Sequence, residues 1–101
     1  MKEINKIADL IMYSGPTINE LLENSKNINK ITINKLNENK IQVLIENILA
    51  YNVKITDKYI YDNNEALIKQ SIIINDKEKI IFDKYIEINT IIKQLNKSNV
   101  A

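Results

Sequence analysis

The chain has 101 residues, a formal net charge of +1 and 45% hydrophobic residues, values that fit a single globular domain spanning 1–101. It contains no Cys, no His and only one Gly, which excludes disulfides, thiolate or imidazole metal sites and Gly-rich phosphate loops. Since its carboxylates, lysines and tyrosines form no distinctive catalytic set, we expect no enzymatic activity, no cofactor and no metal site.

The basic residues are all Lys, and they gather in one segment. Between Ser25 and Lys40 there are four Lys and one acid, whereas the six Lys that follow Tyr59 are balanced by six acids. No apolar run reaches the roughly 18 residues of a membrane helix. Glu3 near the start and Asp9 within the next apolar stretch are unlike a secretory signal. We therefore expect a cytoplasmic protein with no membrane contact.

The first two elements are predicted to be short helices. A helical apolar spacing of i, i+3, i+4, i+7 is formed by Ile4, Ile7, Ala8 and Ile11. Gly15-Pro16 ends this helix. Thr17 and Glu20 then form a capping box that begins a second helix, which ends near Asn24-Ser25.

The segment from Ile28 to Leu36 is ambiguous. Asn29 is a suitable cap for a helix that buries Ile33 and Leu36, but Ile31-Thr32-Ile33 is also typical of a short strand. After it, a clearer helix is predicted over 39–50, with an apolar stripe of Ile41, Leu44, Ile45 and Ile48.

Short β-branched and aromatic runs follow this helix. Residues 52–56 and 59–61 are predicted to pair as a hairpin with Asp57-Lys58 as its turn, although the turn lacks Gly. Residues 67–74 are predicted to add a further strand.

A C-terminal helix is predicted over 75–97, because Asn75 followed by Glu78 resembles an N-terminal cap. Its spacing of 4, 3, 4, 3 is that of a two-heptad seam, which predicts a dimer interface or packing within the domain. Residues 96–101 are predicted to form a frayed tail. The seam residues are Ile81, Tyr85, Ile88, Ile92 and Leu95.

The order of helix, Gly-Pro, T-x-x-E helix, basic element, helix and hairpin over 4–62 resembles the winged helix-turn-helix DNA-binding superfamily. The resemblance implies an α+β fold, a small winged helix-turn-helix with a β-hairpin wing and a C-terminal dimerisation helix. It also implies a recognition helix at 29–36 and a wing tip at 56–58. Alternatively, 39–50 is the third helix and recognition shifts to the wing and the Lys-rich 26–40 segment.

Size, composition and element order also resemble the relaxosome accessory proteins of clostridial conjugative plasmids. The implied function is sequence-specific binding of double-stranded DNA by a homodimer, at an origin of transfer together with other plasmid-transfer proteins, or as a small transcriptional repressor. Because Asn pairs with adenine and Arg is absent, A·T-rich DNA is expected. The predicted DNA contacts are Lys26, Lys30, Thr32, Asn34, Lys35, Lys40, Lys54 and Lys58.

A second interpretation is a protein-interaction module, such as an antirepressor or a phage-encoded inhibitor. The near-neutral net charge of +1 favours it, since most DNA-binding domains are strongly basic. In this case the Lys and Asn residues are ordinary solvated surface, and the seam of the C-terminal helix binds a partner helix.

Overall fold

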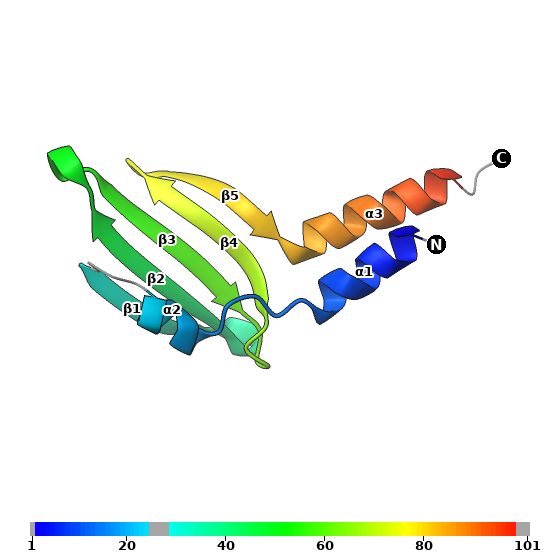
Figure 1. The fold of residues 1–101 in the computed structure, drawn as a ribbon, viewed down its shortest axis with the longest axis horizontal. Helices are drawn as coiled ribbons and strands as arrows, with labels where there is room; N and C mark the ends of the chain where they lie inside the picture. Colours follow the sequence, from blue (N-terminus) through cyan, green and yellow to red (C-terminus); the bar gives the residue numbers. More distant parts are fainter. Residues whose placement is uncertain (1, 25–28, 99–101) are drawn as a thin grey trace.

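The computed structural model describes residues 2–24 and 29–98, and it is dominated by an antiparallel sheet of five strands (Figure 1). The strands lie side by side in chain order: β1 (Lys30–Leu36), β2 (Lys40–Ile48), β3 (Lys54–Tyr61), β4 (Leu67–Ile74) and β5 (Lys77–Asp83). The helices are α1 (Lys2–Met12), α2 (Ile18–Asn24) and α3 (Lys84–Ser98), with short 3-10 turns η1 (Asn37–Asn39) and η2 (Ala50–Asn52).

The predicted winged helix-turn-helix is wrong, because the segments expected to form its recognition and third helices are strands. Residues 30–36 form β1, which confirms the strand alternative for this segment, and most of the predicted 39–50 helix is β2. Ile41, Val43 and Ile45 share one face of β2 at a spacing of two. A short apolar run fits both the helical period of 3.6 residues and the strand period of two. This segment is a strand because it pairs on both sides, with β1 and with β3.

The predicted hairpin over 52–61 is also wrong. Asp57 and Lys58 lie in the middle of the continuous strand β3, where they pair with Ile45 and Leu44 of β2. Asp57 is followed by Lys and not by the Gly that strongly favours a tight turn, and pairing with β2 and β4 keeps this dipeptide extended. The wing tip predicted at 56–58 therefore does not exist, and burial raises the pKa of the Asp57 carboxyl.

The predicted start of the C-terminal helix at Asn75 is wrong by nine residues. Asn75 and Asp76 have φ angles of 51° and 63°, so they form the two-residue turn between β4 and β5 that favours Asn and Asp. The helix α3 begins at Lys84, where the Asp83 carboxylate accepts a hydrogen bond of 3.1 Å from the Ile86 N–H. Strand β4 confirms the prediction for 67–74.

The two N-terminal helices are confirmed. The Thr17 hydroxyl accepts a hydrogen bond of 3.1 Å from the Glu20 N–H, as the capping box predicts. At the other end of the chain α3 runs to Ser98, so the first half of the predicted frayed tail is helical, and 99–101 lie outside the described residues.

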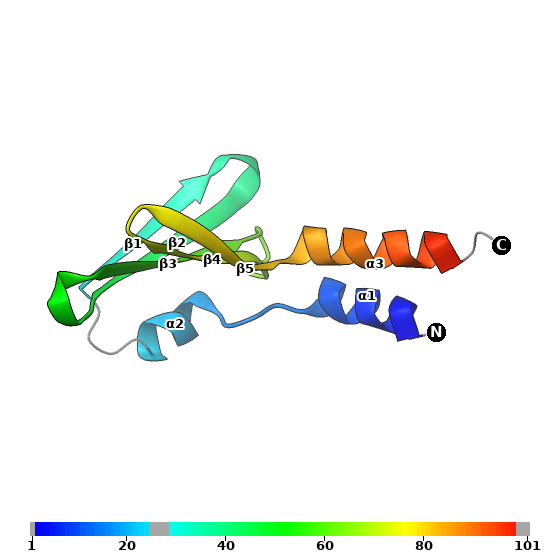
Figure 2. The same ribbon diagram turned by 90° about the horizontal axis from the view of Figure 1, so that it is seen from above.

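The sheet has one covered face and one open face. Leu21 of α2 packs on the covered face, and the core beneath it is completed by Val43, Ile45, Tyr61 and Leu67. Figure 2 shows α2 below the sheet, with β1 and β5 rising on the opposite side. The open face is therefore the inner face of a curved sheet.

Helices α1 and α3 form an antiparallel pair that extends beyond one end of the sheet, with both chain ends far from it (Figures 1 and 2). The linker after α1 attaches this pair to the sheet. Leu67 N–H donates to the Ser14 carbonyl (2.8 Å) and the Tyr61 hydroxyl donates to the Pro16 carbonyl (2.8 Å). The rings of Tyr13 and Phe82 meet edge to face at 5.3 Å.

Candidate functional site

The open face is polar, and its residues are placed by strand pairing. Directly paired residues of antiparallel strands point to the same side, so cross-strand rows can be read from the register. One row is Lys30, Glu46, Thr56, Ile73 and Glu78; the next is Thr32, Leu44, Lys58, Ser71 and Ile80; the third is Asn34, Gln42, Ile60, Lys69 and Asp83.

Six of the eight predicted DNA-contacting residues lie together on this open face. Lys35 points to the opposite side of β1, because it lies between Asn34 and Leu36 on a strand with a side-chain period of two. Lys26 lies outside the described residues. The six that share the face are Lys30, Thr32, Asn34, Lys40, Lys54 and Lys58.

Carboxylates neutralise three of these lysines. Lys58 pairs with Glu78 at 3.2 Å and Lys40 with Glu38 at 3.6 Å. Lys54 forms an ion pair with Glu46. The positive charge of the open face is therefore largely compensated by its own acids.

The pKa values of two carboxyls follow from these pairs. The hydrogen bond from Lys54 holds the pKa of Glu46 below its usual value, with Lys30 adding to the effect. The hydrogen bond from Lys58 does the same for the pKa of Glu78, helped by the charge of Lys69. Both acids are therefore ionised at neutral pH, when they compete with any anionic ligand for the lysines.

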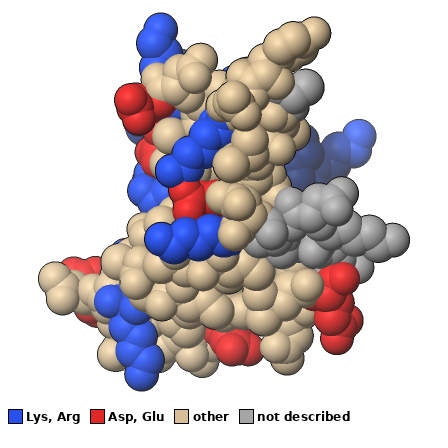
Figure 3. All heavy atoms as spheres, turned by 90° about the vertical axis from the view of Figure 1, so that its left-hand side faces the viewer, with Lys and Arg blue, Asp and Glu red and all other residues tan. Residues whose placement is uncertain are grey.

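The surface charge is mixed at the end of the molecule seen in Figure 3. Lysine and acidic side chains lie next to one another there, with no continuous basic patch. In the three rows of the open face there is no aromatic side chain. Stacking of exposed bases, which single-stranded nucleic-acid sites require, has no residue to support it in these rows.

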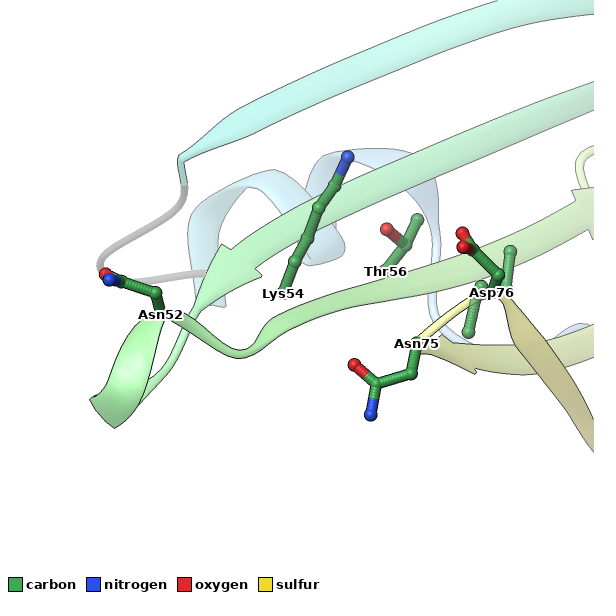
Figure 4. Close-up of a pocket in the computed structure, with 6 residues that line it drawn as sticks. Asn52, Lys54, Thr56, Asn75 and Asp76 are labelled. Carbon is green, nitrogen blue, oxygen red and sulfur yellow. The ribbon is translucent and has the colours of Figure 1, made fainter.

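The open face is hollowed at both ends. Near η2 and the β4–β5 turn there is a polar pocket of about 370 Å³, to which β3 contributes Lys54 and Thr56, and the turns contribute Asn52, Asn75 and Asp76 (Figure 4). At the other end a pocket of about 250 Å³ is lined both by Leu36 of β1 and by Asp83 of β5. Contact of both edge strands with one pocket confirms how strongly the sheet curves.

The second candidate surface is the α1–α3 pair, because its apolar side chains are only partly covered. Ile7 and Leu10 of α1 are half-buried, as are Ile88, Ile91 and Leu95 of α3. These residues therefore form the seam between the two helices. By contrast Ile4 is 50%, Ile11 62%, Tyr85 54% and Ile92 41% exposed.

The predicted dimer seam is consequently divided by the structure. Ile88 and Leu95 face α1 within the chain, whereas Tyr85 and Ile92 are exposed on α3, and Ile81 is exposed at the end of β5. The heptad reading missed this division, because a spacing of 4, 3, 4, 3 merges two neighbouring stripes of one helix.

The exposed stripes of α1 and α3 lie on the same side of the pair. Viewed from its N-terminus, an α-helix turns clockwise by about 100° per residue. On α1, Ile4, Ala8 and Ile11 lie about a quarter-turn clockwise from the seam. On α3, Tyr85 and Ile92 also lie about a quarter-turn clockwise from theirs. Because the helices are antiparallel, the two offsets coincide, and we call these five residues the apolar face.

Sequence reasoning missed the α1 half of this face. The spacing of these residues predicted the helix. The number of apolar side chains around α1 was the additional signal, because it indicated a second contact surface. The four residues Ile4, Ile7, Ala8 and Ile11, with Leu10, give an 11-residue helix more apolar side chains than one neighbouring helix covers.

Other kinds of site find no support in the part of the chain described. No group of three or more acidic side chains in 2–24 and 29–98 is arranged to hold a metal ion. None of the helices there has the length and apolarity needed to span a membrane. Comparison with protein-family models, curated proteins and solved structures gives no match for this chain.

Proposed function

We propose that the chain is a non-enzymatic protein-interaction module whose docking element is the α1–α3 pair. The observation that carries the proposal is the apolar face, formed by Ile4, Ala8, Ile11, Tyr85 and Ile92. Single exposed apolar residues need no explanation, but a contiguous apolar patch is typical of a protein interface. The cytoplasmic location expected from the sequence is part of this proposal.

The arrangement of the helices supports an interface rather than a domain core. Isolated helices shorter than about 12–15 residues are marginally stable in water, and α1 and α3 have 11 and 15 residues. Each of them contacts the other along one seam only, and the pair extends away from the sheet. A partner bound to the apolar face would bury the exposed apolar side chains of both helices.

The test compares proteins retained by a tagged chain in cells that carry its native gene. Ile11→Lys places a charge on the apolar face, whereas Ile86→Lys places the same charge on an equally exposed residue (57%) about half a turn from the seam of α3. We expect a stoichiometric partner to be retained by the wild type and Ile86→Lys and lost by Ile11→Lys. Identical retention by all three proteins contradicts the proposal.

A second candidate function is binding of double-stranded DNA, which the grouping of six predicted contact residues on the open face favours. In this candidate the edge strand β1 contacts the duplex in the manner of β-ribbon readers. Lys30 contacts phosphate, and Asn34 and Thr32 contact base edges of an A·T-rich site. An origin of transfer and a promoter are the two settings in which such binding is proposed.

The pair Asn34 and Lys35 gives this candidate a sharp test, because neighbouring residues of β1 point to opposite faces. Binding to randomised duplex DNA is measured at about 50 and 200 mM salt, because contacts to phosphate lose affinity steeply over this range. Asn34→Ala is expected to relax sequence preference, and Lys35→Ala is expected to leave it unchanged. Absence of binding at the lower salt concentration rejects the candidate.

A further inference from the structure

We infer that the occupant of the apolar face is a second copy of this chain, so that two α1–α3 pairs form a four-helix bundle. This inference rests on the proposed function and names the partner of the same surface. It concerns five residues that share one side of the pair, namely Ile4, Ala8 and Ile11 of α1 and Tyr85 and Ile92 of α3.

The shape of the surface favours a copy of itself. The apolar face is a layer of two antiparallel helices, and the surface that best covers such a layer is another two-helix layer packed at the small crossing angle of four-helix bundles. A two-fold axis makes such contact isologous, so each copy uses the same residues. Each helix then gains a neighbour on a side that is exposed in the monomer.

The area of the face matches a weak dimer. Helices α1 and α3 have 11 and 15 residues, which correspond to lengths of about 16 and 22 Å, and each helix is about 10 Å wide. The footprint is therefore roughly 400 Å² per copy, or roughly 800 Å² in total, which is the size of a weak interface rather than of a permanent one. We accordingly expect a weak, concentration-dependent dimer with a Kd on the order of tens of micromolar.

The first experiment is sedimentation equilibrium of the full chain at protein concentrations from about 1 to 200 μM, a range that brackets the expected Kd. The wild type is expected to pass from monomer to dimer. Ile11→Lys and Ile92→Lys are expected to weaken the dimer by about 100-fold or more, because an unpaired charge would be buried. Ile86→Lys is the matched control and is expected to dimerise like the wild type.

The second experiment does not depend on destabilising the interface. The chain has no Cys, so a single Cys can be placed on the apolar face by Ala8→Cys, with Ile86→Cys as the control. A short bismaleimide is expected to link two copies of the Ala8→Cys chain and to leave the control unlinked. Circular dichroism of each variant reports whether the helices are retained.

Each outcome decides one claim. A wild type that is monomeric throughout, or linkage that is equal in both Cys variants, overturns the dimer. If the wild type is monomeric but Ile11→Lys loses a different protein partner, the proposed function stands while the dimer is rejected. If Ile11→Lys and Ile92→Lys dimerise as strongly as the wild type, a dimer through the apolar face is rejected. If Ile11→Lys also retains every protein partner of the wild type, the proposed function is rejected with it.

Discussion

The ammonium group of Lys84 donates a hydrogen bond of 2.6 Å to the backbone carbonyl oxygen of Tyr13. Lys84 is only 5% exposed although it carries a charge, and it is the first residue of α3, whereas Tyr13 directly follows α1. The bond therefore joins the two helices at the end where both meet the sheet. It ties the C-terminal end of α1 to the N-terminal end of α3.

Replacing Lys84 should loosen this junction. Lys84→Ala leaves the Tyr13 carbonyl without its donor and removes a buried alkyl stem, so we expect a loss of about 1–3 kcal/mol in the free energy of unfolding. Urea denaturation followed by circular dichroism measures it. Lys93→Ala, an exposed lysine on the same helix, is expected to stay within about 0.5 kcal/mol of the wild type. Equal stability of both variants would show that the bond contributes nothing.

Gly15 is required where the linker crosses β4. It has a φ of +67°, and a Cβ placed there would lie 2.8 Å from the Cβ of Leu67, a fully buried core residue. Gly15→Ala combines a left-handed backbone with steric overlap, so we expect it to cost about 2–4 kcal/mol. Thermal unfolding checks this, with the neighbouring exposed residue Ser14 changed to Ala as a control that should shift the midpoint little.

The sequence allowed prediction of those elements whose signals are local. The helix cap at Thr17 depends only on residues within one turn, and its bond from the Glu20 N–H to the Thr17 hydroxyl forms as expected. The strand β2 could not be distinguished from a helix, because Ile41, Leu44, Ile45 and Ile48 also fit a helical period. The secondary structure of this segment depends on pairing with β1 and β3. The residues of these two strands lie outside the short stretch of sequence from which a helix or strand is predicted.

The candidate surfaces were predictable only in part, for the same reason. Lys30, Asn34 and Lys54 were chosen as helix or wing residues, yet they share one face because strand order brings β1 and β3 to either side of β2. The ion pairs of Lys54 with Glu46 and of Lys58 with Glu78 depend on that register and could not be foreseen. The apolar face combines α1 and α3, which are separated by the entire sheet in sequence.

Tyr61 should make stability depend on alkaline pH. Its side chain is fully buried and donates to the Pro16 carbonyl, and burial raises the pKa of its phenol to about 12, with nearby Tyr59 adding to the effect. Since the folded pKa exceeds the unfolded value of about 10, its stabilising contribution is complete below pH ~10. That contribution is lost as pH rises toward 12, by up to about 2–3 kcal/mol.

The measurement is urea denaturation of the wild type and Tyr61→Phe from neutral pH to pH ~11.5, a range that covers most of this titration. Tyr61→Phe should be less stable at neutral pH by about 1 kcal/mol, through loss of the hydrogen bond. Its stability should then fall less steeply above pH ~10 than that of the wild type. Tyr51→Phe, which alters a 98% exposed side chain, should keep the wild-type slope. Identical slopes in all three proteins would show that the Tyr61 phenol does not titrate differently on folding.

The carboxylates of the open face give the last prediction, which concerns the DNA-binding candidate. Glu46 forms an ion pair with Lys54 and lies directly opposite Lys30, so Glu46→Gln removes a charge that repels phosphate and releases a lysine. We expect affinity for duplex DNA to rise several-fold. The slope of log K against log salt should steepen by about 1 for each lysine that gains a phosphate contact.

Glu87→Gln on α3 changes the net charge equally but lies away from the open face. Equal gains in the two variants would indicate a general charge effect and would remove the open face as the DNA-binding surface.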